Sequence, residues 1–448
     1  MSNAIRTGAC CFLTAIVWLT AAVGAEPAYR VGTFKVDITP DYPIRLNGFG
    51  FRRAESEGVT QPIWAKALAV SWEDDPPVVL LAIESLGVRM GMVDEVAARL
   101  QKRFGVPREN VALTYTHSHT TPKVNGASDN IFSEPIPAGH QEHIDRYSTE
   151  LPQRLEQAAA MAIENRVPAT LQWCTGKYDL ARNRRTPGGP VDHDLPMLVA
   201  RDMDGGLLAV YVSYACHCVT LSNNKISGDW AGFAQAEIEK RNPGCVALIS
   251  VGAGSDSNPA SGVVGDKVDV AAAQGAALAD AVTRMLGGPQ KPLSGNITAQ
   301  LKSIPLPLND LPTREQWTAL AAKGGPEGYN AATQLARLDR GESLATSVNY
   351  PIQTFAFGKQ LTMVFLAGEV CADYSLRLKQ ELGADRLWVN AYCNDFCCYI
   401  PSERLVREGG YGGGSEIPYF ALPATLKAGL EQTIVDEVKR QFGQAGGR

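Results

Sequence analysis

Two histidines separated by one residue follow an apolar segment in the first third of the chain. In TYTHSHTTP, His117 and His119 come after residues 110–115, whose apolar and β-branched side chains are typical of a strand. In an extended backbone, residues i and i+2 point to the same side, so both imidazoles can face one point. Imidazole is a common metal ligand. The pair therefore indicates the start of a metal site, unless one ring only forms a hydrogen bond and the other lies at the surface.

The other four of the six histidines differ in context. His217 closely follows a predicted strand over residues 207–214 and precedes the turn-rich run NNKISGDWAG, which makes it a second imidazole at a strand end. His140 and His143 lie at the start of a predicted helix with acidic neighbours, where we expect a solvated helix face. His193 lies beside two carboxylates in VDHD, where it would either contact a residue that binds the metal or lie at the surface.

Three further segments place polar side chains at strand ends. Glu369 follows the apolar run TMVFLAG, and a carboxylate there needs a cation or a hydrogen-bond donor to offset its desolvation, unless it is exposed and caps a helix starting at Val370. Tyr399, in NDFCCYIPSER, follows the predicted strand 386–391 and by itself indicates nothing. Ser257 lies in GAGSDSNP, a loop whose small residues would let a substrate approach the backbone.

Apolar strands and amphipathic helices alternate along the chain, which predicts an α/β fold. We expect a single large mixed α/β domain, with strand ends after Tyr115, Tyr214, Leu366 and Ala391 converging on one cleft that holds the metal site. The predicted strands cover residues 66–71, 78–83, 110–115, 207–214, 245–250, 361–366 and 386–391. The predicted helices cover residues 93–104, 230–241, 268–285, 370–382 and a last segment from 426 to 438.

Composition excludes several classes of protein. The chain has 448 residues, of which 45% are hydrophobic and 20% charged, as in an ordinary globular protein rather than a disordered or fibrous one. Its formal charge of −5 is spread without long blocks of one sign, so we expect no nucleic-acid partner.

The first 25 residues are typical of an export signal. Arg6 supplies a positive start, an apolar stretch covers residues 9–23, and small residues up to Ala25 offer a cleavage site. A retained membrane anchor is the alternative, but the stretch is short and has no basic flank after it. We therefore expect a periplasmic or secreted protein that begins near Glu26.

Cysteine usage does not indicate a disulfide scaffold. Of the ten cysteines, eight lie beyond the predicted signal peptide, and an even number in an exported chain permits disulfides. No CxxC pair occurs, which argues against zinc-ribbon and thioredoxin sites. We expect most of them to be small buried hydrophobic residues.

Taken together, the motifs resemble the neutral (non-lysosomal) ceramidases, specifically their N-terminal catalytic domain. THSHTTP, ACH followed by ISGDWAG, GAGSDSNP, FLAGE and CYIPSERLVREGGYGGGSE occur in the order of that family, and VGTFKVDITPDYPIRLNGFG and the NRR at residues 183–185 fit as well. The resemblance covers residues 31–411. It implies one ceramidase-like catalytic domain over residues 26–448 after a signal peptide over 1–25, and we expect no counterpart of the family's C-terminal immunoglobulin-like domain.

The resemblance further implies an exported, zinc-dependent amidohydrolase that cleaves the N-acyl amide bond of a ceramide-like lipid with a zinc-activated water, in sphingolipid metabolism. Carried over by motif, the Zn²⁺ ligands would be His117, His217, Glu369 and Tyr399. Two imidazoles and a carboxylate suit zinc, and the metal would favour ionisation of the tyrosine.

Three other residues acquire roles from the resemblance. His119 would serve as acid/base or oxyanion partner, Arg184 would fix the substrate, and Ser257 falls near a conspicuous serine of the family. The family's THTHSGPGG is THSHTTPKV here, so the pocket near His119 loses glycines and must differ in shape. The implied partner is a small-molecule amide or lipid substrate, with a peripheral membrane-lipid contact also open.

Two alternatives remain at this point. Metallo-β-lactamases and amidohydrolases also begin from HxH, but Thr120 and Thr121 do not provide the Asp-His of the first, and no segment resembles the other ligand motifs of the second. A metallohydrolase for another amide or ester stays open. So does an exported binding protein on the same scaffold, which would retain little metal after purification.

Overall fold

The computed structural model describes residue 1 and residues 29–445, so the predicted signal peptide lies outside the described residues apart from the first one.

Most of the strands and three of the helices belong to units of the same order, β-β-β-α-β. The first unit contains β1 (Tyr29–Asp37), β2 (Trp64–Trp72), β3 (Val78–Ile83), α1 (Met90–Phe104) and β4 (Val111–Tyr115). The second contains β5 (Val167–Lys177), β7 (Asp194–Asp202), β8 (Leu207–Tyr214), α3 (Asp229–Arg241) and β9 (Val246–Val251). The third contains β12 (Ile297–Pro307), β13 (Ser347–Phe357), β14 (Leu361–Leu366), α7 (Ala372–Leu382) and β16 (Leu387–Asn390).

Strand pairing repeats in all three units. The first three strands of each unit pair antiparallel in chain order, and the fourth strand, after the helix, pairs parallel with the third. A parallel partner requires a crossover connection, which α1, α3 and α7 supply. β1 also pairs antiparallel with β5, so the first two units form one sheet while the third forms its own.

The carboxyl ends of the three fourth strands meet at the centre of the molecule. Beyond β16, the backbone N–H of Ala391 donates to the carbonyl of Val251 at the end of β9, at 3.1 Å. The backbone N–H of Tyr115, at the end of β4, donates to the carbonyl of Tyr392, also at 3.1 Å. These bonds join the loops that follow β4, β9 and β16, and those loops carry the site.

Side chains alternate between two sides of the strands. Leu68, Val70, Tyr211, Phe365 and Trp388 belong to an interior cluster to which all three units contribute strand residues and no described helix contributes any. Within it, the rings of Tyr211 and Trp388 stack with centroids 4.8 Å apart. The opposite side of the strands packs against the helices, so the units meet through strands and are covered by helices outside.

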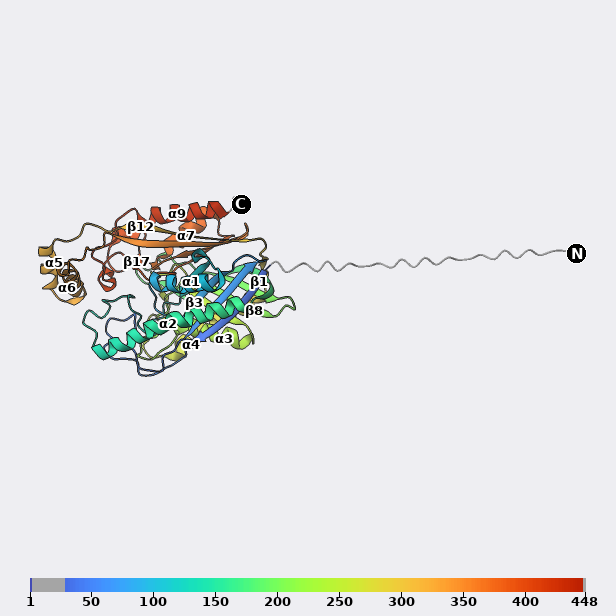
Figure 1. Cartoon of the computed structure of the whole chain (residues 1–448), viewed down its shortest axis with the longest axis horizontal. Coiled ribbons are helices and arrows are strands. Elements are labelled where there is room, and N and C mark those ends of the chain that lie inside the picture. Colours follow the sequence, from blue (N-terminus) through green and yellow to red (C-terminus); the bar gives the residue numbers. More distant parts are fainter. Residues whose placement is uncertain (2–28, 446–448) are drawn as a thin grey trace.

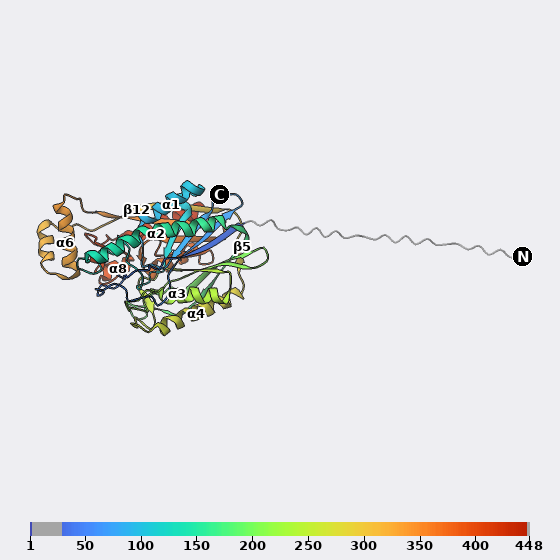
Figure 2. The same cartoon turned by 60° about the horizontal axis from the view of Figure 1, so that its bottom comes forward.

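The covering helices include α2 (Ala138–Glu164), α4 (Val268–Leu286) and α9 (Leu430–Ala445). α2 crosses β1, β2 and β3 beside α1, α3 packs against α4, and α9 lies over β12 and β13, as Figure 1 shows. A hairpin of α5 (Arg314–Ala321) and α6 (Gly325–Asp339) lies at one end of the molecule in both views (Figure 2). None of the helices within residues 29–445 has the length and apolar character of a bilayer span.

The remaining elements are short and several lie at the site. Two strand pairs each join a segment inside a unit to the segment that follows the same unit: β6 (Ala181–Asn183) with β10 (Ser257–Pro259), and β15 (Glu369–Val370) with β17 (Tyr399–Ile400). The others are β11 (Lys291–Pro292), α8 (Glu403–Glu408) and the 3₁₀ turns η1 (Arg108–Asn110) and η2 (Ile417–Phe420).

The expected mixed α/β fold with converging strand ends is confirmed. The imidazole centroids of His117 and His217, predicted to lie within reach of one metal, are 5.0 Å apart. All eight described cysteines are unpaired thiols and seven are buried, as expected for small apolar residues. One alternative is wrong: Glu369 does not cap a helix at Val370, because α7 begins at Ala372 after Cys371, and Glu369 is buried in β15.

Candidate metal centre

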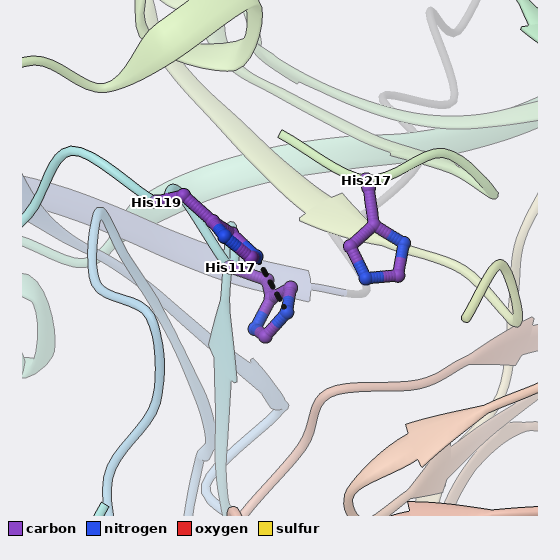
Figure 3. A group of neighbouring side chains, drawn as sticks. All are labelled: His117, His119 and His217. Carbon is purple, nitrogen blue, oxygen red and sulfur yellow. Dashed lines mark hydrogen bonds between the residues drawn. The ribbon is translucent and has the colours of Figure 1, made fainter. Parts of the chain in front are cut away.

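Three imidazoles converge where the loops after β4 and β8 meet. The centroid of the His117 ring lies 4.9 Å from that of His119 and 5.0 Å from that of His217. Figure 3 shows the three rings, with the Nε2 atoms of His117 and His119 3.2 Å apart. One ring nitrogen from each residue lies within 4.8 Å of the other two, so the group could hold a metal ion.

The HSH segment is not extended, which corrects the geometry expected from the sequence. His117 has φ 55°, in the left-handed region that non-glycine residues rarely adopt. The turn still brings both imidazoles to one point. The backbone N–H of His119 donates to the carbonyl of Cys218 at 3.1 Å, so the loop with His117 is tied directly to the loop with His217.

A carboxylate completes the group. Glu369 Oε2 lies 3.3 Å from His117 Nε2 and 3.2 Å from His217 Nε2, and all three side chains are buried. Gly368, directly before it, has φ +68°, and a Cβ on this residue would lie 2.4 Å from the carbonyl oxygen of Cys398. The glycine in FLAGE therefore allows the backbone before Glu369 to lie against the strand that carries Tyr399.

Hydrogen bonds on the far side of the rings fix which nitrogen faces the centre. His117 Nδ1 lies 2.7 Å from the carbonyl of Leu86, and His217 Nδ1 lies 3.0 Å from the carbonyl of Gly254. A carbonyl oxygen only accepts hydrogen bonds, so both Nδ1 atoms carry the hydrogen. In the neutral rings both Nε2 atoms are then bare acceptors that point at Glu369, an arrangement common among metal-ligating histidines.

The protonation states of this group call for a cation. Burial, together with the nearby charge of Arg184, lowers the pKa of His217 to about 4, so its ring is neutral at pH 7. Burial would raise the pKa of Glu369, but the fields and hydrogen bonds of His117 and His217 hold it well below its ordinary value. An ionised carboxylate and two imidazole nitrogens that face one another at 3.2–3.3 Å are stabilised by a positive charge between them, either a proton or a metal ion. The donors therefore fit a metal ion.

Tyr399 and Arg184 lie beside this group. Tyr399 is the register partner of Glu369 in the β15–β17 pair and is buried. Arg184 Nη2 donates to the Tyr399 hydroxyl at 2.8 Å. Arg184 follows β6, and its backbone N–H donates to the carbonyl of Asp256 at 2.7 Å, so the β6–β10 pair joins the NRR segment to the loop of Ser257.

Ser257 lies next to the centre but has no activating base among the described residues. Its carbonyl accepts the backbone N–H of His217 at 3.0 Å, while its buried Oγ has no hydrogen-bond partner there. The neighbouring Asp256 carboxylate is used elsewhere: it accepts the backbone N–H of Ala372 and the side-chain amide of Asn183, both at 3.0 Å.

The loop that surrounds His119 contains residues that the sequence motifs do not single out. A Cβ on Gly48 would lie 2.6 Å from Cγ and Nδ1 of His119, and the Phe49 ring meets the imidazole edge-on at 5.0 Å. Arg52 is buried and donates to the carbonyl of His119 at 2.5 Å. Gly48 and Phe49 belong to the motif VGTFKVDITPDYPIRLNGFG, which ends before Arg52, and nothing in the spacing of these residues indicates a contact with residue 119.

Tyr392 is another residue that the sequence analysis missed. Its ring centroid lies 4.7 Å from that of His117, its φ is 56°, and its buried hydroxyl has no partner among the described residues. Its position immediately after Ala391, at a predicted strand end, was the available signal.

The remaining histidines lie outside the centre. His140 and His143 are near the start of α2, as predicted, but the expected solvated face is only half right. His143 is half-buried, with Nδ1 2.7 Å from Glu55 Oε1, and packs against the ring of Tyr42. His193 Nδ1 lies 3.2 Å from the carbonyl of Tyr178.

Comparisons with known proteins agree with the motifs. The chain is 26% identical to neutral ceramidase of Drosophila pseudoobscura pseudoobscura over 255 residues and 26% identical to that of Drosophila melanogaster over 254. Each alignment covers 51% of this chain and only about a third of the relative, 35% and 34%. No family model matches the chain.

The fold comparison covers more of the chain. The crystal structure of neutral ceramidase from Pseudomonas aeruginosa superposes with a TM-score of 0.73 at 18% identity, over 94% of this chain and 76% of that one. A ceramidase complexed with C2 superposes equally well. The resemblance predicted from the motifs is therefore confirmed: this chain is similar to the neutral ceramidases in sequence over half of its length, and it has their fold.

Proposed function

We propose that this protein is an exported zinc-dependent amidohydrolase that cleaves the N-acyl amide bond of a ceramide-like lipid. The observation that carries the proposal is the convergence of His117, His217 and Glu369, three buried acceptors that need a cation, within a chain whose relatives are neutral ceramidases. Export rests on the signal-like first 25 residues, and a place in sphingolipid metabolism rests on the names of the relatives.

Zinc is the metal that these donors suit best. With bonds of about 2.0–2.1 Å, neighbouring ligands of a zinc ion with four or five ligands would lie roughly 2.8–3.4 Å apart. The distances from Glu369 Oε2 to His117 Nε2 and His217 Nε2, 3.3 and 3.2 Å, match that spacing. Tyr399 is the fourth proposed ligand, because its register with Glu369 puts it beside the carboxylate. When bound, zinc supplies a Lewis acid and a water that ionises near neutral pH.

The chain's own residues would handle the proton and the substrate. Burial lowers the pKa of His119 well below its ordinary value, so its ring is neutral and can accept a proton from the attacking water at Nε2. It would then pass that proton to the nitrogen of the departing amine. Arg184, held against Tyr399, would orient the polar end of the substrate, and Ser257 would contribute only to its positioning.

A metal and turnover measurement tests this function. The purified protein is expected to contain about one zinc per chain and to release fatty acid from short-chain ceramide, with activity lost on chelation and recovered with added zinc. Zinc without turnover of ceramide but with turnover of other N-acyl amides or esters would favour a different substrate. Protein that holds no zinc and hydrolyses none of them would favour the exported binding protein.

A further inference from the structure

A second polar feature lies next to the metal centre, on the outer side of Tyr399. Arg184, Arg185 and Tyr411 line an open pocket of about 320 Å³. The rings of Tyr411 and Tyr399 meet edge-to-face with centroids 5.5 Å apart. Because Arg184 also donates to the Tyr399 hydroxyl, the pocket and the proposed metal site share a wall.

The pocket carries two guanidinium groups whose positive charge the protein offsets only in part. Among residues 29–445, Arg184 forms no ion pair, and its one side-chain hydrogen bond goes to Tyr399. Its guanidinium also lies 5.3 Å from the centroid of the Tyr411 ring. The guanidinium of Arg185 donates to the backbone carbonyls of Tyr411 at 2.5 Å and Gly409 at 2.9 Å. Its only carboxylate partner, Glu408, is 3.4 Å away and partly exposed.

Two guanidinium groups at the wall of a pocket beside the proposed metal site favour an anionic ligand. The planar fork of arginine binds a carboxylate through two parallel hydrogen bonds, and such charge-assisted bonds are stronger than neutral ones. Neutral hydroxyl groups, such as those of the ceramide head, would leave this charge unpaired. An amide whose nitrogen bears a short carboxylate-containing group would place its carbonyl toward His117, His217 and Glu369 and its carboxylate toward the two arginines.

We propose that, among the N-acyl lipids that the proposed function covers, N-acyl amino acids are preferred to neutral ceramides, with the carboxylate bound by Arg184 and Arg185. This inference rests on the proposed amide hydrolysis. Water cleaves the C–N bond: its oxygen joins the acyl carbon, one of its protons goes to the departing amine nitrogen, and the products are a fatty acid and a free amino acid. Tyr411 would close the pocket against the carboxylate, since its ring already faces the Arg184 guanidinium.

The test compares two amides that differ only in the last group of the head, which is charged in one and neutral in the other. N-lauroylglycine and N-lauroylethanolamine have the same acyl chain, and a carboxylate in the first replaces a hydroxymethyl group in the second. The zinc-loaded protein is expected to hydrolyse N-lauroylglycine with a kcat/KM at least about tenfold higher. Calorimetry on the chelator-treated protein should show the same preference in binding, which separates recognition of the head group from turnover.

Variants of the pocket sharpen the test. Arg185→Gln is expected to lower the ratio of the two kcat/KM values by about tenfold, and Arg185→Lys, which keeps the charge, should restore part of it. Arg182→Gln is the matched control, because Arg182 lies on the same segment but is exposed and paired with Asp179 at 2.6 Å. The ratio should be unchanged in that variant.

The outcomes distinguish this inference from the function on which it rests. Equal or better hydrolysis and binding of N-lauroylethanolamine would overturn the carboxylate pocket while leaving amide hydrolysis intact. A preference for the phosphate ester of N-lauroylethanolamine over N-lauroylglycine would overturn the assignment to amino acids. Failure to hydrolyse either amide with zinc present would count against the proposed function, and the binding measurement would then decide the inference by itself.

Discussion

Glu369 and Tyr399 are direct register partners in a parallel pair of two-residue strands. The backbone N–H of Glu369 donates to the carbonyl of Cys398 at 2.9 Å. The backbone N–H of Gly368 donates to the carbonyl of Asp395 at 2.8 Å. Neighbours in register point to the same side of a sheet. Two residues from separate loops of the third unit are thus held side by side next to His117 and His217, with little freedom to move apart.

The first prediction concerns metal content. His117→Ala, His217→Ala and Glu369→Gln should each lower zinc occupancy more than tenfold, because each removes one of three donors that face one point. His140→Ala should leave occupancy unchanged, since His140 lies near the start of α2 and not in the metal-binding group. Elemental analysis of the purified variants, with circular dichroism to check folding, measures both.

Loss of zinc in all four variants together with altered circular dichroism would indicate general misfolding. Full zinc in the first three would remove the metal hypothesis.

A second prediction tests the close approach before Glu369. Gly368→Ala places a Cβ 2.4 Å from the carbonyl oxygen of Cys398 and also forces a left-handed φ of +68° on alanine. Backbone strain of this kind costs about 1–3 kcal/mol. We expect at least that loss in the free energy of unfolding, measured with urea, and weaker zinc binding, because the β15–β17 pair must open.

Gly105→Ala is the control for this variant. Gly105, at the end of α1, has nearly the same φ, +70°, but its added Cβ would meet open space. It should show the strain alone and keep its zinc. Equal losses in both variants would mean that the approach to Cys398 is unimportant.

The sequence predicted the strands more fully than their arrangement. Apolar runs such as residues 207–214 and 361–366 coincide with β8 and β14, because burial on both sides leaves a continuous apolar signal. The three-fold repeat of β-β-β-α-β was invisible, since each unit fills the same topology with different side chains. Strand order depends on which apolar faces fit one another, and short-range patterns do not encode that.

In the candidate site, too, single residues could be predicted from the sequence but their contacts could not. His117 and His217 were recognisable as imidazoles at strand ends, whereas Glu369 could also have capped a helix and was assigned to the site through the family resemblance. Tyr399 was uninformative by itself, because only its pairing with Glu369 gives it a place at the centre. Gly48 was missed because its contact with His119 joins loops 71 residues apart, and no local pattern marks such a contact.

The third prediction separates positioning of His119 from metal binding. Gly48→Ala would press a methyl group against Cγ and Nδ1 of His119, both 2.6 Å from the added Cβ, and so turn the imidazole away from its present direction. We expect kcat to fall about tenfold or more, as for a displaced acid/base group, while zinc occupancy stays within about twofold of that of the unaltered protein.

Gly58→Ala provides the comparison for that variant, because Gly58 also has a positive φ, +132°, but open space around its added Cβ. It should keep kcat. A Gly48→Ala protein with full activity would show that the ring direction of His119 does not matter.

The last prediction concerns Ser257, which would be the nucleophile if the reaction passed through a covalent acyl-enzyme. A serine nucleophile needs an adjacent base. The Ser257 hydroxyl has no partner among the described residues, and the Asp256 carboxylate is held by Ala372 and Asn183. A water activated by zinc needs no such base. Ser257→Ala should therefore cost only positioning, roughly tenfold to a hundredfold in kcat/KM, or about 1.4–2.8 kcal/mol on the barrier.

Chelation should abolish turnover of both the unaltered protein and the Ser257→Ala variant, and added zinc should restore each to its own level. A serine mechanism predicts two different results. Ser257→Ala would be completely inactive with zinc fully bound, and mass spectrometry of quenched reactions would detect an acyl group on Ser257. Neither is expected here, because the backbone N–H of His217 donates to the carbonyl of Ser257 and ties this residue to the metal-binding loop as a structural contact. Activity in a rigorously metal-free preparation would reject the zinc-dependent mechanism outright.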